Sequence, residues 1–245
     1  MAFDVVTRED LVRRVHEFVD CGASHVVRFV PTHPVVLAKR DDEYRRMLNG
    51  SSLVLADGVG PVLGARLNGA TLTRISGTEG MRAILAEEGL RHYLFGGSPA
   101  VADALRARVA ALYGEEAVVG VESPPFRTLS DEEWEGAARR MRAAGAEIVW
   151  VGLGTPKQDY AAAKLQALSA APVIASVGAA FDFYAGSKRR APWIMRTLGL
   201  EWLFRLIQEP RRLWRRYMVG NALFVYDLVV SALPRRAAGS APAKR

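Results

Sequence analysis

Short unbroken apolar runs alternate, over most of the chain, with longer stretches in which apolar residues recur every three or four positions. Unbroken runs are typical of strands that are covered on both faces, whereas the longer period indicates amphipathic helices. The predicted strands lie at 25–30, 52–56, 92–96, 117–121, 147–151 and 172–178, with a short extended piece at Leu72–Ile75. The predicted helices lie at 7–20, 34–49, after Asp57-Gly58, and at 78–88, 99–113, 130–144 and 156–168. Strands that alternate with helices in this way predict an α/β fold, a mostly parallel sheet with helices on both faces.

The alternation stops at Gly186, and the composition of the chain changes there. Residues 187–233 read as an arginine-rich, all-helical appendage, and the final "PRRAAGSAPAKR" has the composition of a disordered tail. We therefore expect a catalytic body at 1–186, a basic appendage at 187–233 and a disordered tail at 234–245. Within the body, Thr7 with Asp10 and Ser130 with Glu133 have capping-box spacing and predict two helix starts.

Charge divides the chain at the same place. Residues 1–186 hold 20 Lys and Arg against 23 Asp and Glu, whereas residues 187–245 hold 13 against 3. A mildly acidic body joined to a strongly basic segment favours an anionic partner: a phosphate, a membrane surface or a nucleic acid. A basic face that meets only solvent is the plain alternative.

Several classes of protein are disfavoured by what the chain lacks. Its one cysteine, Cys21, cannot form an internal disulfide, and its four scattered histidines do not make a zinc site. The first ten residues lack the apolar core of a signal peptide, so we expect no export. The most apolar stretch, "MVGNALFVYDLVVSAL", is interrupted by Asn221 and Asp227 and is shorter than the roughly 20 residues that a membrane span needs.

Unusual residues follow the predicted strands, where parallel sheets bind their ligands. Asp57 follows strand 52–56, and strand 92–96 ends in the pair Gly96-Gly97. Gly152, Gly154 and Pro156 follow strand 147–151, and Asp182 follows strand 172–178. Glycine turns before helix starts suit the close approach of a phosphate or a sugar. Each feature alone is also an ordinary turn, and the clustering at one sheet edge is what favours a site.

Taken together, these segments resemble the WecG/TagA/CpsF glycosyltransferases, also called glycosyltransferase family 26. The motifs that carry the resemblance are "LVLADGVG", "RISGTEG", "FGGSP", "SPPF", "VGLGTPKQD", "VGAAFDFYAG", "KRRAPWIMRTLGLEWLFRLIQEPRRLWRRY" and "GN". They run from about Leu53 to Asn221. The resemblance implies a Rossmann-like fold and an inverting transferase that moves a sugar, commonly an N-acetylhexosamine such as N-acetylmannosamine. The donor would be a UDP-sugar and the acceptor a saccharide linked to polyprenyl diphosphate, in the synthesis of teichoic acid, common antigen, capsule or exopolysaccharide.

The resemblance also assigns roles to residues. Asp57 would be the base that takes the proton of the acceptor hydroxyl. The donor-binding residues would be Arg74, Gly77, Thr78, Gly97, Lys157, Gln158 and Asp182. Arg205, Arg212 and Arg215 would contact diphosphate oxygens, since guanidinium groups bind phosphate in pairs of hydrogen bonds. Asp182 acting only as a backbone cap, and the arginines as surface charges, stay open as alternatives.

We expect neither a metal nor a cofactor, with arginines neutralising the leaving group. The acidic run Asp41-Asp42-Glu43 reads as the solvated face in the middle of helix 34–49. One motif departs from the family: where its members carry a Thr-x-Asn-like motif, this chain has Phe29, Val30 and Pro31, with Thr32 and His33 just beyond. Either Thr32 or His33 takes over at the acceptor diphosphate, or the acceptor is handled differently. A smaller departure is Asp159, where Glu is common.

The basic appendage fits an acceptor held at a membrane. Nine basic residues and Trp193, Trp202 and Trp214 fall within 187–217, a mixture suited to an anionic interface. The resemblance implies a peripheral protein at the cytoplasmic face of the plasma membrane, gated by membrane contact or by a change between monomer and homo-oligomer. No nucleic-acid-binding module accompanies the charge, so we expect no such partner. Two other functions are weighed: a non-catalytic nucleotide-sugar-binding or phosphate-binding module that docks at membranes, and an NAD-dependent oxidoreductase, which lacks its full glycine fingerprint here.

Overall fold

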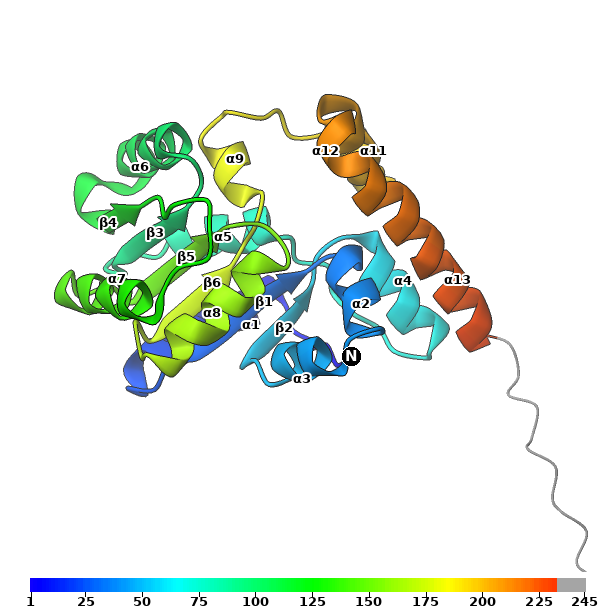
Figure 1. The fold of residues 1–245 in the computed structure, drawn as a ribbon, viewed down its shortest axis with the longest axis horizontal. Helices are drawn as coiled ribbons and strands as arrows, with labels where there is room; N and C mark the ends of the chain where they lie inside the picture. Colours follow the sequence, from blue (N-terminus) through cyan, green and yellow to red (C-terminus); the bar gives the residue numbers. More distant parts are fainter. Residues whose placement is uncertain (233–245) are drawn as a thin grey trace, which may run out of the picture.

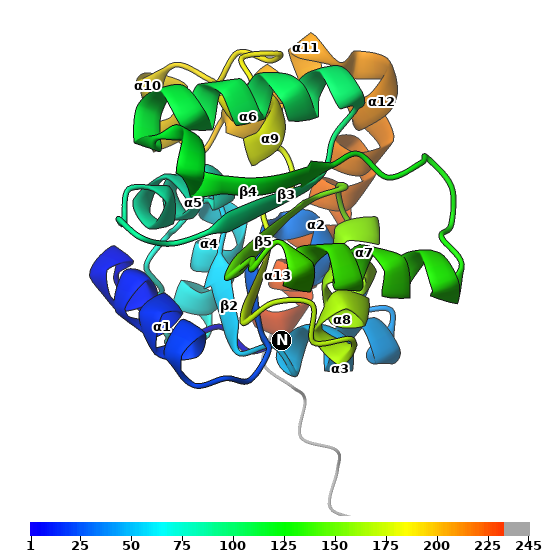
Figure 2. The same ribbon diagram turned by 90° about the vertical axis from the view of Figure 1, so that its left-hand side faces the viewer.

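A single sheet of six parallel strands forms the centre of the computed structural model, which describes residues 1–232 (Figures 1 and 2). The strand order across the sheet is β2-β1-β6-β5-β3-β4. The strands are β1 (His25–Val30), β2 (Leu53–Ala56), β3 (His92–Gly96), β4 (Val118–Glu122), β5 (Ile148–Gly152) and β6 (Val173–Ser176). Because all six strands are parallel, their carboxyl ends meet at one edge of the sheet.

Helices cover both faces of this sheet, as the alternating pattern predicts. Up to Gly186 they are α1 (Arg8–Asp20), α2 (Thr32–Ala38), α3 (Asp42–Asn49), α4 (Val59–Leu67), α5 (Gly77–Leu85), α6 (Pro99–Tyr113), the 3-10 turn η1 (Glu115–Ala117), α7 (Asp131–Ala143), α8 (Lys157–Ala167) and α9 (Ala180–Tyr184). Helices α1, α5 and α6 pack on one face, and α7 and α8 on the other (Figure 2). The α/β, Rossmann-like fold class is confirmed.

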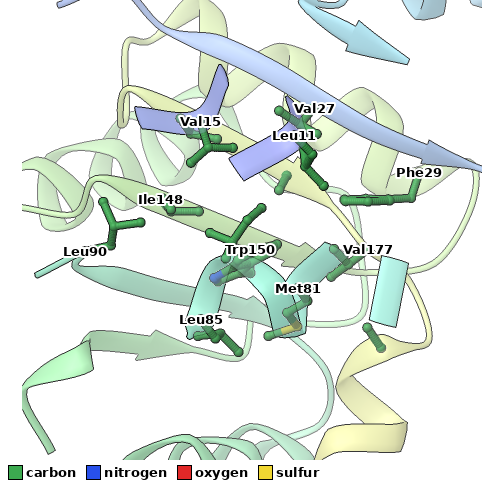
Figure 3. Close-up of a cluster of buried hydrophobic side chains, with 14 of the residues drawn as sticks. Leu11, Val15, Val27, Phe29, Met81, Leu85, Leu90, Ile148, Trp150 and Val177 are labelled. Atoms are coloured by element: carbon green, nitrogen blue, oxygen red, sulfur yellow. The ribbon is translucent and has the colours of Figure 1, made fainter. Parts of the chain in front are cut away.

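The larger core lies between the sheet and helices α1 and α5 (Figure 3). Leu11 and Val15 of α1 and Met81 of α5 are fully buried there against Trp150 of β5. Trp150 needs a partner for its indole N–H in this apolar setting. It donates to Nδ1 of His92, also fully buried, across 3.2 Å. This core holds the central strands in place, so the turns that follow their carboxyl ends start from fixed positions.

Local signals in the sequence gave two helix starts correctly and one wrongly. The capping boxes at Thr7 and Ser130 are confirmed. The prediction of one helix over 34–49 is wrong, because the chain breaks after Ala38 and Asp41 caps a new helix by accepting from the N–H of Tyr44 at 2.9 Å. The acidic run is thus the start of α3 and not the middle of a helix. The predicted extended piece at Leu72–Ile75 is reduced to one bridge, between Ala56 and Arg74.

Beyond Gly186 the chain forms no strand as far as it is described, and from Trp193 onward it is mostly helical. This C-terminal segment, residues 187–232, contains α10 (Trp193–Thr197), α11 (Glu201–Gln208), α12 (Pro210–Trp214), the π-helical turn η2 (Arg215–Val219) and α13 (Gly220–Ala232). Helix α13 packs against α2 and α4 (Figure 1). Within residues 1–232, no helix has both the length and the apolar character needed to cross a bilayer. The predicted tail at 234–245 lies outside the described residues, and the division into body and appendage stays a prediction.

Candidate active site

A cavity of about 1430 Å³ lies at the carboxyl edge of the sheet, between the strand ends and the C-terminal segment. The turns after β2, β3, β5 and β6 line one side of it, and residues of α11, α12, η2 and α13 line the other. Of the predicted site residues, those in the lining are Asp57, Arg74, Thr78, Gly97, Lys157, Gln158, Asp182, Arg205, Arg212, Thr32 and His33. The structure therefore brings together most of the residues that the resemblance implies.

Asp57 stands at the end of β2, held from two sides. Its backbone N–H donates to the carbonyl of Val30 at the end of β1, at 3.0 Å. The next residue, Gly58, has a left-handed φ of 97° that allows the tight turn into α4. The Oδ2 atom of Asp57 accepts from the N–H of Gly77 at 3.3 Å. Gly77 itself is buried outside the lining, so its contribution is this hydrogen bond at the start of α5.

The surroundings of Asp57 make its carboxylate unusually basic. Burial raises the pKa of this carboxyl from 3.8 to about 6, and the nearby carboxylates of Glu201 and Glu79 add to the effect. The hydrogen bond from Gly77 and the charge of Arg205 oppose it. Such a group is ionised at neutral pH and still able to accept a proton, as general bases require. The raised pKa of Asp57 therefore favours a catalytic role over the alternative of an ordinary Asp-Gly turn.

The glycine turns bring backbone close to the cavity. Gly97, with φ at 73°, donates its N–H to the carbonyl of Gly152 at 3.1 Å, and its own carbonyl accepts from Ser123 at 2.6 Å. Gly96 could not carry a side chain, because a Cβ there would lie 2.6 Å from the carbonyl carbon of Gly152. These contacts hold the turns that follow β3 and β5 closely against each other.

The side chain of Gln158 is held beside these turns by the turn that follows β5. Its Oε1 accepts from the N–H of Gly154 at 3.1 Å, and the side chain is 3% exposed. A Cβ on Gly178 would come within 3.2 Å of the same oxygen, so the β6 turn also lies against it. Lys157, one residue earlier, also lines the cavity, with Nζ 4.4 Å from the ring centre of Phe126. The two neighbours thus present a fixed amide and a mobile cation to the cavity.

Asp182 belongs to a chain of alternating charges that reaches the C-terminal segment. Its carboxylate accepts from Lys188 Nζ at 3.1 Å and from Ser187 Oγ at 3.4 Å. Lys188 also pairs with Glu209 at 2.9 Å, and Glu209 pairs with Arg212. The partners described for the Asp182 carboxylate are side chains, which does not fit the alternative of a pure backbone cap. Asp182, predicted to bind the donor, and Arg212, predicted to bind diphosphate, are therefore both engaged in this chain of ion pairs.

Arg216 is one of the cavity cations that the sequence did not identify. Arg215, predicted to bind diphosphate, is exposed and lies over the ring of Trp214 at 5.9 Å, away from the cavity lining. Arg216, in the π-helical turn η2, lines the cavity in its place. Its Nε is buried without a hydrogen-bond partner, and none of the described carboxylates is within ion-pair distance of it. Burial and the nearby Arg205 and Arg212 lower its pKa.

Thr32 and His33 lie at the start of α2, and both reach the cavity. Thr32 packs against Gly60 of α4, where a Cβ would come within 2.2 Å of its Oγ1. The Nδ1 atom of His33 is buried without a partner. Burial and the charge of Arg216 lower the pKa of His33 to about 4, so the ring is neutral at pH 7. The departure at Phe29-Val30-Pro31 thus leaves two polar side chains next to the arginines.

Beneath the site lies a buried network that the sequence analysis missed. Arg28 of β1, 1% exposed, donates to Asp159 Oδ1 at 3.2 Å and to the carbonyl of Asp159 at 3.0 Å. Tyr44 donates to Asp159 Oδ2 at 2.7 Å. Burial raises the pKa of Asp159 against the opposing effect of these two partners. The network fixes the first turn of α8 and with it Gln158. The signal for it in the sequence is Arg28, a charged residue inside the apolar strand β1.

Arg74 and the start of α5 link the cavity to the C-terminal segment. Ser76 and Glu79 form a capping box, and Arg190 donates to both of them, at 3.2 and 3.4 Å. Arg74 donates to the carbonyl of Arg196 at 3.1 Å. Among residues 1–232, no three His, Cys, Asp or Glu side chains are grouped so that they could hold a metal ion.

A comparison with protein families agrees with this geometry. The family model described as "Glycosyl transferase WecG/TagA/CpsF family" matches residues 1–238, nearly the whole chain of 245 residues. The match includes every residue of the cavity lining. The chain belongs to the WecG/TagA/CpsF family of glycosyltransferases.

Proposed function

We propose that this glycosyltransferase moves a hexose or an N-acetylhexosamine, of the N-acetylmannosamine type, from a UDP-sugar to a saccharide linked to polyprenyl diphosphate, with inversion at the anomeric carbon. One observation carries the proposal. A basic carboxylate on Asp57, the polar groups of Gln158 and Asp182, and three arginines, Arg205, Arg212 and Arg216, line the same cavity. Each step of an inverting transfer has a residue there that suits it.

In the proposed reaction Asp57 takes the proton of the acceptor hydroxyl. The hydroxyl oxygen forms its bond to the anomeric carbon from one side, while the bond from that carbon to the UDP oxygen breaks on the other. The electron pair leaves with UDP. Single displacement inverts the configuration, and it requires a base on the acceptor side alone. The pKa of about 6 for Asp57 suits this role.

The departing UDP carries negative charge that must be neutralised. We assign this to Arg205 and Arg212 without a metal ion, because guanidinium groups bind phosphate oxygens through paired hydrogen bonds. Arg216, which lies beside His33, is assigned to the diphosphate of the acceptor. The unpartnered Nε of Arg216 supports this assignment. Arg215, whose guanidinium lies over Trp214, is not proposed as a contact.

The donor is proposed to lie along the turns after β3, β5 and β6. Gly97 and Lys157 would meet the diphosphate, and Gln158 and Asp182 would hydrogen-bond the hydroxyls and acetamido group of the sugar. Arg74 and Thr78 would close the pocket beside Asp57, where Gly77 holds the carboxylate. For Asp182 to bind the sugar, Lys188 must release one of its oxygens or share it.

The acceptor is proposed to reach the cavity from a membrane surface, the cytoplasmic face of the plasma membrane. Trp193 is 68% exposed and Trp214 is 51% exposed, next to a run of arginines in the C-terminal segment. Exposed tryptophans beside arginines suit an anionic interface, where each basic residue contributes roughly 1 kcal/mol. This supports peripheral attachment in the synthesis of a cell-surface polysaccharide.

Release of UDP from UDP-N-acetylmannosamine in the presence of a lipid-diphosphate acceptor tests the proposal. We expect acceptor-dependent release by the wild type and at least a hundredfold loss in Asp57→Asn, since a general base contributes about that much or more. Saturable UDP-sugar binding with no turnover that depends on Asp57 would instead favour the non-catalytic binding module.

A further inference from the structure

One arm of the cavity is apolar and runs between α4 and α13. Its lining residues are Val59, Gly60, Leu63, Phe224, Val225 and Leu228. We call this set the α4–α13 groove. It belongs to the same cavity as Asp57 and the arginines, yet none of its side chains is polar or charged. Neither the proton transfer nor the neutralisation of UDP uses it.

The groove starts at the reacting end of the cavity and leads away from it. Both helices begin beside α2: Gly60 packs on Thr32, and a Cβ on Gly220 would lie 3.6 Å from His33. Further along, Gly64 faces Phe224 and Leu228: a Cβ on Gly64 would lie 3.6 Å from each of these side chains. The two helices therefore run side by side in the same direction (Figure 1). The nine residues of α4 extend for about 13 Å, enough for a short length of aliphatic chain.

The walls of the groove are open although they are apolar. Val59 is 42%, Leu63 is 44% and Val225 is 57% exposed. A ligand that covered them would remove apolar surface from water, which is favourable by about 25 cal/mol per Å². Gly60 and Gly64 let α4 pack closely, Gly60 against Thr32 and Gly64 against Phe224 and Leu228, so the base of the groove is closed by these contacts.

A cation lies where the groove begins. Arg216 is close to the neutral ring of His33 at the start of α2, and Gly220 at the start of α13 lies beside the same ring. The one acid of α13 close to the groove, Asp227, turns toward α2 and the residues after it, pairing with Lys39 at 3.4 Å and with Arg40 at 3.1 Å. A ligand that matches both ends has an anionic head against Arg216 and an aliphatic chain along the helices.

We propose that the α4–α13 groove binds the first isoprenoid units of the acceptor's lipid chain. The inference rests on the proposed function, because it takes the acceptor to be a prenyl diphosphate. The occupant is a single chain drawn from the bilayer into the groove, with its diphosphate at Arg216, beside His33. This places the lipid end of the acceptor along α13 and its saccharide end toward Asp57, and the enzyme would thus select acceptors by their chain.

The test compares binding of farnesyl diphosphate and methyl diphosphate by calorimetry, without any transfer step. We expect the wild type to bind the farnesyl compound at least tenfold more tightly, which corresponds to burying roughly two methylene groups. Leu63→Gln and Val225→Asn should bring this ratio to about threefold or less, with little change for methyl diphosphate.

Two variants on the same helices serve as matched controls. Leu67 is 56% and Val229 is 55% exposed, and neither lines the groove. Leu67→Gln and Val229→Asn should keep the wild-type ratio. Equal binding of both compounds by the wild type, or an equal loss in all four variants, would overturn the proposal. Since no sugar is transferred in this experiment, a failure of the proposed activity would leave its result readable.

Discussion

The backbone N–H of Gly77 donates a hydrogen bond to Asp57 across 3.3 Å, between residues 20 positions apart in the chain. The bond fixes the carboxylate at the carboxyl end of β2, and burial raises its pKa to about 6. A side chain that is both oriented and poised to accept a proton is what the proposed transfer requires. The first prediction concerns the pH at which this group titrates.

Activity should fall in acid as Asp57 takes up a proton. Because burial raises the pKa of Asp57 to about 6, the active carboxylate predominates above that pH and is lost below it. We expect kcat/KM to be level above pH 6 and to fall roughly tenfold per pH unit below it. Binding of UDP, measured over the same range, is the control. A flat kcat/KM between pH 7 and 5 in a folded enzyme would rule out Asp57 as the base.

Arg216 and Arg215 are adjacent but should differ sharply in importance. Arg216 lines the cavity with an unpartnered Nε, whereas the guanidinium of Arg215 lies over Trp214. Arg216→Ala should lower kcat/KM by roughly 10- to 100-fold, the effect of losing a charged hydrogen bond to phosphate. Arg215→Ala should change it less than threefold in an assay with a soluble acceptor. Equal effects of the two changes would contradict the assignment.

Glu209 should compete with the substrate diphosphate for Arg212. Its carboxylate pairs with Arg212 and with Lys188, which in turn holds Asp182. Glu209→Gln removes that negative charge, and we expect UDP to bind several times more tightly, as measured by calorimetry. Glu135→Gln, which removes an exposed carboxylate from α7, is the control and should leave affinity unchanged. Weaker binding by Glu209→Gln would mean that the glutamate positions Arg212 instead of competing for it.

The buried network below Gln158 should contribute strongly to stability. Arg28→Met leaves Asp159 buried beside Tyr44 without its cation, which typically costs about 3–5 kcal/mol of unfolding free energy. Arg139→Met breaks an exposed pair with Glu135 and should cost less than about 1 kcal/mol. Urea denaturation measures both values. A similar small loss in the two variants would show that the network is not needed for stability.

The sequence was most informative where a local pattern decides the structure. Apolar periodicity predicted the strands and most helices, and capping chemistry placed the starts at Thr7 and Ser130. It failed at Asp41, because an aspartate can either begin a helix or lie on its solvated face, and the choice depends on the packing of Tyr44. The helix boundary was therefore set by tertiary contacts.

The candidate site shows the same limit. Strand ends identified Asp57, Gln158 and Asp182, since the carboxyl edge of a parallel sheet brings them together. Which of two adjacent arginines faces the cavity depends on the winding of η2, and the sequence does not reveal it. The partner of Arg28 lies 131 positions away in the chain and becomes visible only when β1 and α8 pack together.

The central claim is that Asp57 drives sugar transfer in this cavity. Mass spectrometry of the lipid product tests it most directly, after the wild type and Asp57→Asn are incubated with UDP-N-acetylmannosamine and a prenyl-diphosphate-linked saccharide. The account predicts that the wild type adds one N-acetylhexosamine to the acceptor and that Asp57→Asn adds none while still binding UDP. Product formed equally well by both proteins, or by neither although both bind UDP, would contradict it.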